Sequence, residues 1–292
     1  MKKSFNTNPV RRLLVPTDFS SDALNAVRYG VQFGKVLKSR ITLFHATHVP
    51  VVSTAEMAMA ASMIDDKMEA QVQLEKLKAK LIEEFAYPHI DVLISMGFAV
   101  DEITKLSRDE SMDMIVMGTK GASGLAEVLI GSNTADVIEK CSCPVLAVPS
   151  ESVFKKPQKI VFATNYADND FQTLYLLAEM FKPFNPEIVV LHVEVNNDHK
   201  TENRMLEWFK GQVLTNIPYD NFSFELAKGD GVISTVENFI VANNIDLLSV
   251  STRKRNFFDK LTSRSLTKKL AFHIDMPLLA FHAHTVSSTP LF

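Results

Sequence analysis

Four apolar segments from the first half of the chain recur in the same order in the second half, 133 to 147 residues later. This duplication strongly constrains the fold, because each copy must bury its own set of strand-like segments. Helical patterns separate the segments in both halves, which predicts strands alternating with helices. The paired segments are 12–18 with 159–165, 41–46 with 188–193, 113–117 with 246–250, and 143–148 with 276–281.

Alternating strands and helices favour a parallel sheet with helices on both faces. At 292 residues the chain is long enough for two domains that each bury a core. We therefore predict the α/β class, with two tandem domains at residues 1–150 and 151–292, each built on a five-stranded parallel sheet. The segment 149–158 contains prolines among charged residues and is the expected linker.

The first half carries a glycine-containing loop between a predicted strand at 114–117 and a predicted helix. Gly118, Gly121 and Gly131 lie in this loop, and Ser132 follows at the expected helix start. Backbone N–H groups at such a junction attract anions, and the helix dipole adds to the attraction. Glycines after a strand also serve ordinary turns, so the loop alone leaves both interpretations open.

A second strand end makes the phosphate interpretation stronger. The segment 12–16 ends in Thr17 and Asp18, and Ser20 or Ser21 is the candidate cap of the next helix. In an open parallel sheet the carboxyl ends of the strands line the ligand crevice. Asp18 and the glycine loop are therefore expected to face one ligand.

These residues resemble the universal stress protein family, in its ATP-binding branch. The strand end 16–20, the segment 43–46, Gly97 before a helix and the Gly-x2-Gly-x9-Gly-Ser pattern follow the order of the family. The similarity is close over the first 150 residues and weaker beyond them. It implies two domains like those of the adenine nucleotide alpha-hydrolases. In this family the terminal strands pair antiparallel across a dimer interface, so 145–148 and 278–281 are expected to form an intrachain pseudo-dimer.

The resemblance also implies an ATP site in the first domain, with Mg²⁺ neutralising part of the phosphate charge. Asp18 would contact the ribose, and Thr17 and Ala46 would border the adenine. The other implied contacts, along the ribose and phosphates, are Met117, Gly118, Gly121, Gly131, Ser132 and Asn133. A cytoplasmic stress-response protein with ATP as a regulatory or sensing ligand is the resulting hypothesis. Slow ATP hydrolysis stays open, although the sequence offers no general base and no catalytic residue.

The second half has changed at the positions that carry this chemistry. Asn165 stands where the first half has Asp18. The three glycines are replaced by Ser251, Lys254 and Arg264. Long side chains would fill the space that a phosphate needs beside the backbone, so only the first domain is expected to bind ATP. The basic run 253–255 is either a solvated turn or a site for a different anion.

Composition limits the classes of partner. The chain has 31 Lys and Arg against 34 Asp and Glu, and neither half is basic, so no nucleic-acid surface is expected. No apolar stretch reaches the length of about 18 residues that a membrane helix needs, and the first residues lack the apolar part of a secretory signal. We expect a cytoplasmic protein in which Cys141 and Cys143 are reduced packing residues.

Several features have competing interpretations. Met57, Met59, Met63 and Met68 belong to a long helix expected at about 54–85, and core or subunit packing is favoured there over a partner-binding face. His282 and His284 have the spacing of a metal contact but lack a third ligand. His45 and His192 occupy equivalent strand ends, where packing or hydrogen bonding is expected.

Two other functions compete with ATP sensing. The first is a scaffold or interaction protein of the same fold that binds no nucleotide, and homodimer formation is open in either case. The second is a relative of the electron-transfer flavoproteins or nucleotide alpha-hydrolases that acts on adenylates. It would need a catalytic signature, and neither a Gly-x-Ser-x-Gly element nor a His-Glu-x-x-His element occurs in the chain.

Overall fold

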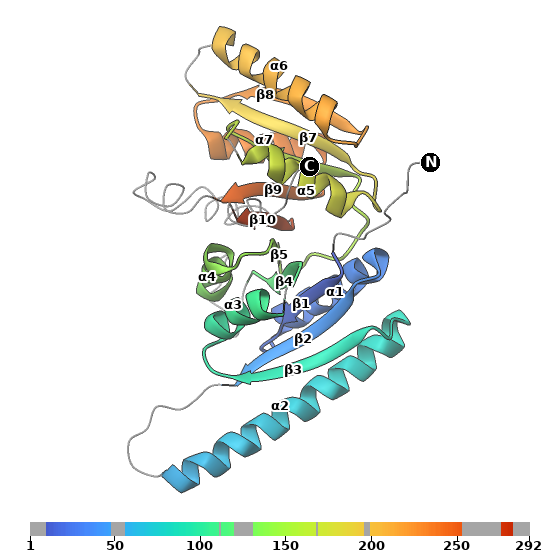
Figure 1. The fold of residues 1–292 in the computed structure, drawn as a ribbon, viewed down its shortest axis with the longest axis vertical. Coiled ribbons are helices and arrows are strands. Elements are labelled where there is room, and N and C mark those ends of the chain that lie inside the picture. The colour runs from blue at the N-terminus through green and yellow to red at the C-terminus, as the bar shows by residue number, and fades with distance from the viewer. Residues whose placement is uncertain are drawn as a thin grey trace. The chain divides into compact units, whose positions relative to one another are not determined.

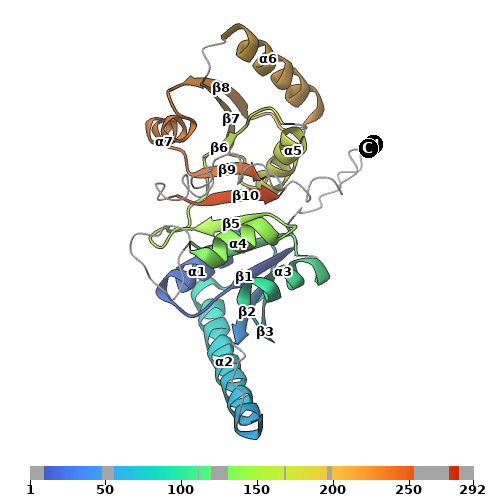
Figure 2. The ribbon, with the colours of Figure 1, turned by 90° about the vertical axis from the view of Figure 1, so that its left-hand side faces the viewer.

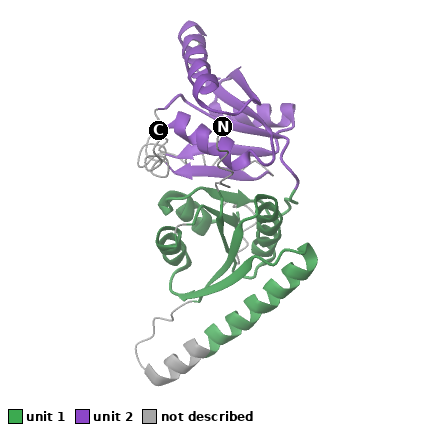
Figure 3. Ribbon diagram, turned by 45° about the vertical axis from the view of Figure 1, so that its right-hand side comes forward, with its two compact units in different colours: residues 1–126, 131–154 green, residues 127–130, 155–292 purple. Residues whose placement is uncertain are grey.

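The computed structural model describes residues 10–47, 56–110, 112–119, 131–167, 169–195, 199–252 and 276–282, with the backbone alone at 56–64. The described residues divide into two compact units, one ending at Phe154 and the other beginning at Lys155 (Figure 3). Gly121, Lys254, Arg264 and His284 lie outside the described residues.

Strands and helices alternate throughout the first unit (Figure 1). Its elements are β1 (Arg12–Pro16), α1 (Ser21–Leu37), β2 (Arg40–Thr47), α2 (Glu56–Phe85), β3 (Ile90–Met96), α3 (Ala99–Asp109), β4 (Met114–Gly118), α4 (Ser132–Lys140) and β5 (Val145–Val148). The strand order is β3-β2-β1-β4-β5, and every neighbouring pair is parallel. Helix α1 packs beside α2 and α3 beside α4, so helices cover both faces of the sheet.

The second unit repeats this arrangement (Figure 2). Its elements are β6 (Lys159–Ala163), α5 (Asp170–Phe181), β7 (Glu187–Glu194), α6 (His199–Asn216), β8 (Phe222–Lys228), α7 (Val232–Asn243), β9 (Leu247–Thr252) and β10 (Leu278–His282). The strand order is β10-β9-β6-β7-β8, again with parallel pairs. The predicted α/β class and the duplicated parallel sheet are confirmed. The antiparallel pairing of the two terminal strands stays a prediction.

The central strands are buried on both faces, as parallel sheets require. Leu13, Leu14 and Val15 of β1 have no exposed surface. Helix α1 lies close to this strand because residue 30 is a glycine, and a Cβ atom there would come within 3.2 Å of Val15 Cγ2. This close packing holds the middle of α1 against β1.

The long helix α2 has one buried face and one exposed face. Leu74 and Leu81 pack inward, whereas the Met68 side chain is 63% exposed. The side chains of Met57, Met59 and Met63 are not among those that the structure describes. No helix among the described residues is both long and apolar enough to cross a membrane.

Both cysteines of the chain are packing residues, as predicted. Cys141 and Cys143 are buried and form no disulfide. Burial raises the pKa of each thiol, and the nearby Cys141 sulfur raises that of Cys143 further. Neither cysteine is therefore an activated nucleophile.

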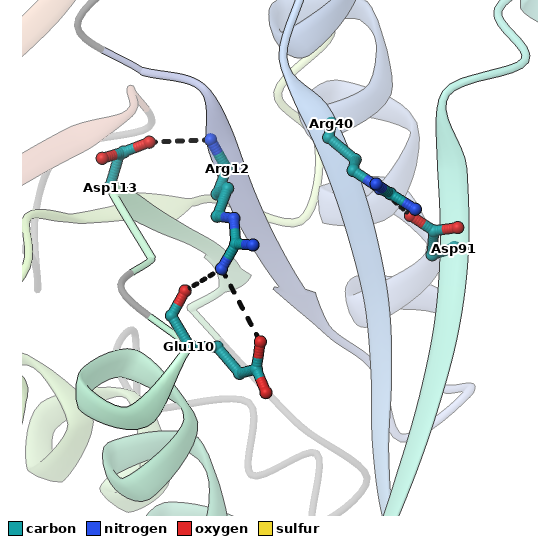
Figure 4. A network of polar contacts seen from close by, with 5 residues as sticks. All are labelled: Arg12, Arg40, Asp91, Glu110 and Asp113. Carbon is teal, nitrogen blue, oxygen red and sulfur yellow. Dashed lines mark hydrogen bonds and ion pairs between the residues drawn. The ribbon is translucent and has the colours of Figure 1, made fainter.

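Carboxylates tie the amino ends of the strands together in both units, and Figure 4 shows the contact in the first unit. In the first unit, Asp113 Oδ2 accepts hydrogen bonds from the backbone N–H groups of Arg11 and Arg12, both at 2.7 Å. In the second, Asp246 Oδ2 accepts from Gln158 N at 2.8 Å and Lys159 N at 3.0 Å. This contact is a duplicated element of the fold and lies at the strand ends opposite to the predicted site.

Candidate functional site

A pocket of about 270 Å³ opens at the carboxyl ends of β1, β2 and β4 in the first unit. Its volume is close to the lower end of the range of about 300 to 1,000 Å³ that is typical of ligand pockets. Eight of the nine predicted site residues line it: Thr17, Asp18, Ala46, Met117, Gly118, Gly131, Ser132 and Asn133. The ninth, Gly121, lies outside the described residues. Residues more than 110 positions apart in the sequence thus meet at one edge of the sheet.

The chain turns sharply where β1 ends. Thr17 N donates to Phe44 O at 2.8 Å, which continues the pairing with β2, and Thr17 Oγ1 accepts from Phe19 N at 3.0 Å. Phe19 has a φ of 63°, a left-handed conformation that costs a bulky residue energy and is often found near functional sites. Ser20 then caps α1 by accepting from Ala23 N at 3.3 Å.

Asp18 is exposed beside this turn, with its carboxylate held in one orientation. Asp18 Oδ1 accepts from both the backbone N–H and the hydroxyl of Ser20, at 3.0 and 2.5 Å. A carboxylate offers about four acceptor positions, enough to hold Ser20 and to accept from a ligand hydroxyl as well. The same serine therefore caps the helix and orients the acid.

His45 supports the turn from β2. Its Nδ1 lies 2.8 Å from Thr17 O, and because a carbonyl oxygen only accepts, Nδ1 carries the proton of this bond. The ring centroids of His45 and Phe19 are 4.8 Å apart. The predicted strand-end role of His45 is confirmed, and its ring also lines the pocket.

Helix α4 presents an uncapped N-terminus to the pocket. Its N-cap residue is Gly131, which has no side chain to accept from the first N–H groups, and the first intrahelical bond runs from Ala135 N to Gly131 O at 3.1 Å. The N–H groups of Ser132, Asn133 and Thr134 therefore have no intrahelical acceptor. Such groups, with the positive end of the helix dipole, form a site for an anion.

The rest of the lining is mostly apolar. It comprises Pro16, Ala23, Phe44, Ala99 and Ile103, together with Thr134. Sequence reasoning missed these residues, although Ala99 and Ile103 have a signal in their spacing, since positions i and i+4 share one face of the helix that follows Gly97. An apolar wall, an oriented carboxylate and a helix N-terminus together suit a ligand with a flat ring, hydroxyl groups and negative charge. Among the described residues, no group of three or more His, Cys, Asp or Glu side chains could hold a metal ion.

The second unit repeats the turn and places a buried acid beside it. Tyr166 has a φ of 58°, and His192 Nδ1 lies 2.8 Å from Thr164 O. Asp170 stands where the first unit has Ala23, counting 147 residues back. Its carboxylate is 3% exposed and accepts from Thr164 Oγ1 at 2.7 Å and Ala167 N at 3.0 Å.

Further polar contacts surround this strand end. Asn169 Nδ2 donates to Ser251 Oγ at 2.6 Å, and Ser251 is the residue that replaces Gly118. His192 Nε2 lies 3.0 Å from the Glu202 carboxylate of α6. Burial raises the pKa of the Tyr166 hydroxyl, and the Glu202 charge raises it further. Asn169 and Ser251, and likewise His192 and Glu202, thus contact one another, whereas the buried Tyr166 hydroxyl has no hydrogen-bond partner among the described residues.

Known proteins resemble both the first half and the whole chain. The model of the universal stress protein family matches residues 9–149. Universal stress protein MJ0531 of Methanocaldococcus jannaschii is 30% identical over 155 residues, which cover 52% of this chain and 86% of that protein. The crystal structure of a universal stress protein from Archaeoglobus fulgidus DSM 4304 has a TM-score of 0.70 at 18% identity, over 93% of this chain and 96% of that one, and shows the same fold. A universal stress protein crystallised in complex with cAMP is 21% identical over 47% of this chain and 96% of its own, with a TM-score of 0.33.

Proposed function

Because this chain belongs to the universal stress protein family, we propose that its first unit binds ATP as a regulatory or sensing ligand. The observation that carries the proposal is the pocket in which Asp18 and the uncapped N-terminus of α4 meet. One element supplies an acceptor for hydroxyl groups and the other supplies donors for an anion. ATP has both kinds of group on one molecule.

The adenine would lie against the apolar part of the pocket. Met117, Ala46 and Ile103 line this part, and Met117 is 7% exposed. A flat ring buried against such side chains is stabilised mainly by the apolar area removed from water. Thr17 would border the ring from the end of β1.

The ribose would bond to Asp18. Ser20 already orients this carboxylate, so little side-chain freedom is lost when a hydroxyl group donates to it. Hydrogen bonds to a charged acceptor are also stronger than neutral ones. Asp18 would therefore anchor the sugar between the base and the phosphates.

The phosphates would rest on backbone N–H groups at the start of α4. Gly118 and Gly131 would allow close approach, and Ser132 and Asn133 would add donors. Gly121 is proposed for the same path. Mg²⁺ arriving with the phosphates would neutralise part of their charge.

A regulatory ligand is favoured over a substrate that is turned over. Asp18 and His45 are the ionisable side chains of the described lining, and His45 Nδ1 donates to Thr17 O. Asp18 accepts from the Ser20 hydroxyl, but that hydroxyl also caps α1, which gives the pair a structural role in the turn. We propose a cytoplasmic protein whose first unit changes its interactions when ATP is bound.

Calorimetric titration of the whole chain with ATP in the presence of Mg²⁺ tests this function. One site per chain is expected, and freshly purified protein is expected to release ATP into an acid extract, which mass spectrometry would identify. Titration with adenosine should give weaker binding, because the phosphate contacts are missing. If ATP gives no binding signal and the extract holds no nucleotide, the scaffold hypothesis would replace this one.

A further inference from the structure

We propose that Thr134 is a positioning residue that holds the N-terminus of α4 in the place where it can bind the ATP phosphates. This inference rests on the proposed function and adds a residue to its machinery. Thr134 would act through the helix to which it belongs, without being the main contact of the ligand.

The hydroxyl group of Thr134 links α4 to the strand that precedes it. Thr134 Oγ1 donates to Gly118 O at 2.8 Å, and the residue is 3% exposed. Gly118 is the last residue of β4, so the bond spans 16 residues of sequence. Both partners line the pocket.

Threonines in other helices of this protein use their hydroxyl groups differently. Thr104, Thr173 and Thr235 each donate to the carbonyl four residues earlier, at 2.7 to 2.9 Å. Those bonds are local and tie a helix to itself or to its own cap. Thr134 instead ties its helix to the end of a strand.

A second bond fixes the same junction. Gly131 N donates to Thr119 O at 2.6 Å, and Thr119 N donates to Val148 O at 3.0 Å, so the turn after β4 is also joined to β5. Two tethers therefore define both the distance and the direction of α4 relative to the sheet. Removing one leaves the body of the helix packed against α3 and β5 but loosens its first turn.

A looser first turn would affect one part of the ligand more than the rest. Interactions between an anion and a helix terminus act over the first turn alone, so a small displacement weakens them. The apolar wall comes from Met117 of β4, Ala46 of β2 and Ile103 of α3, and Asp18 belongs to the turn after β1, so none of these residues lies on α4. Loss of the Thr134 bond should therefore weaken binding of the phosphates and leave binding of adenosine unchanged.

Calorimetry on four proteins tests the inference: the wild type, Thr134→Val, Thr134→Ser and the control Thr235→Val. Valine removes the hydroxyl and keeps the shape, whereas serine keeps the hydroxyl. Thr235 is a matched control because it is also a buried threonine bonded to a glycine carbonyl at a helix start, in the second unit. Thr134→Val should bind ATP about tenfold more weakly, as expected for one lost hydrogen bond. Its affinity for adenosine, and the ATP affinity of the other two variants, should match the wild type.

Three results would overturn the inference. Unchanged ATP affinity in Thr134→Val would show that the bond does not position the helix. An equal loss of ATP and adenosine affinity would point to a general change in the pocket. If Thr134→Ser lost as much affinity as the valine variant, the hydroxyl would not be the cause. In each case the wild type still binds ATP, so the proposed function stands; only a wild type that binds no ATP contradicts both.

Discussion

The ends of β1 and β6 have the same backbone and different chemistry. Each strand runs into a threonine, then a residue with an exposed side chain, then an aromatic residue with a left-handed backbone. In each, a histidine of the next strand lies 2.8 Å from the threonine carbonyl. The second unit keeps these features although it has lost the glycines, so the strained turn and its histidine are part of the duplicated fold.

The two turns differ in the position of the carboxylate beside them and in what that carboxylate bonds to. In the first unit a small Ala23 lines a pocket, and Asp18 faces that pocket. In the second, the buried Asp170 occupies the position of Ala23 and accepts bonds from the turn itself. The comparison shows that the acid of the first unit faces a pocket, whereas the acid of the second unit is buried and bonded to its own turn.

The largest expected effect comes from giving the first unit the residue of the second at the helix start. Gly131→Arg copies Arg264, and the φ of −64° at Gly131 is accessible to arginine, so the fold should survive. The long side chain would occupy the phosphate path, and ATP affinity should fall on the order of 100-fold. Gly211→Arg, in α6 where a Cβ meets nothing within 4 Å, is the matched control. Calorimetry that finds full affinity in Gly131→Arg would contradict the proposed phosphate path.

Removing the internal acid of the second unit should destabilise that unit. Asp170→Ala leaves the Thr164 hydroxyl and the Ala167 N–H without their acceptor, at a cost of about 3 kcal/mol. Trp208 is the single tryptophan of the chain and lies on α6, so its fluorescence during denaturation reports on this unit. Asp170→Asn keeps one acceptor oxygen and should lose less. An unchanged denaturation midpoint in the alanine variant would mean that Asp170 does not hold the turn.

A smaller effect is expected from exchanging the residue beside each turn. Asp18→Asn copies Asn165 and removes a charged acceptor, which should weaken ATP binding about tenfold. The reverse change, Asn165→Asp, should create no second site, because the second unit still lacks the three glycines and still has Asp170 in the position of Ala23. Equilibrium dialysis measures both affinity and stoichiometry. Two equivalent ATP sites in any of these proteins would contradict the proposal that only the first unit binds ATP.

The smallest effect on binding is expected from joining the two terminal strands. Cysteines at Leu146 of β5 and Leu279 of β10 should cross-link within one chain if the strands pair as an intrachain pseudo-dimer, and ATP affinity should not change. Mass analysis under denaturing conditions separates a cross-linked monomer from a dimer. Cross-links found solely between chains would refute the pseudo-dimer.

Much of the fold and of the site follows from local sequence patterns. Apolar strands separated by helices were expected at 12–18, 41–46 and 145–148, and β1, β2 and β5 lie there. Ser20 caps α1, as the capping rules predict, whereas the N-cap of α4 is Gly131 and Ser132 is the first residue of that helix. The residues proposed for the ligand lie at strand ends, which the general rule for open parallel sheets already identifies.

The sequence by itself determined the order of the elements and the two copies of the turn, because both depend on residues near one another in the chain. Only the tertiary structure decided that Ile103 forms a wall of the pocket, that Thr134 bonds to Gly118, and that Asp170 bonds to the turn after β6. Each of these contacts depends on how a helix is placed against strand ends. That placement depends on packing of the whole unit, which no local pattern encodes.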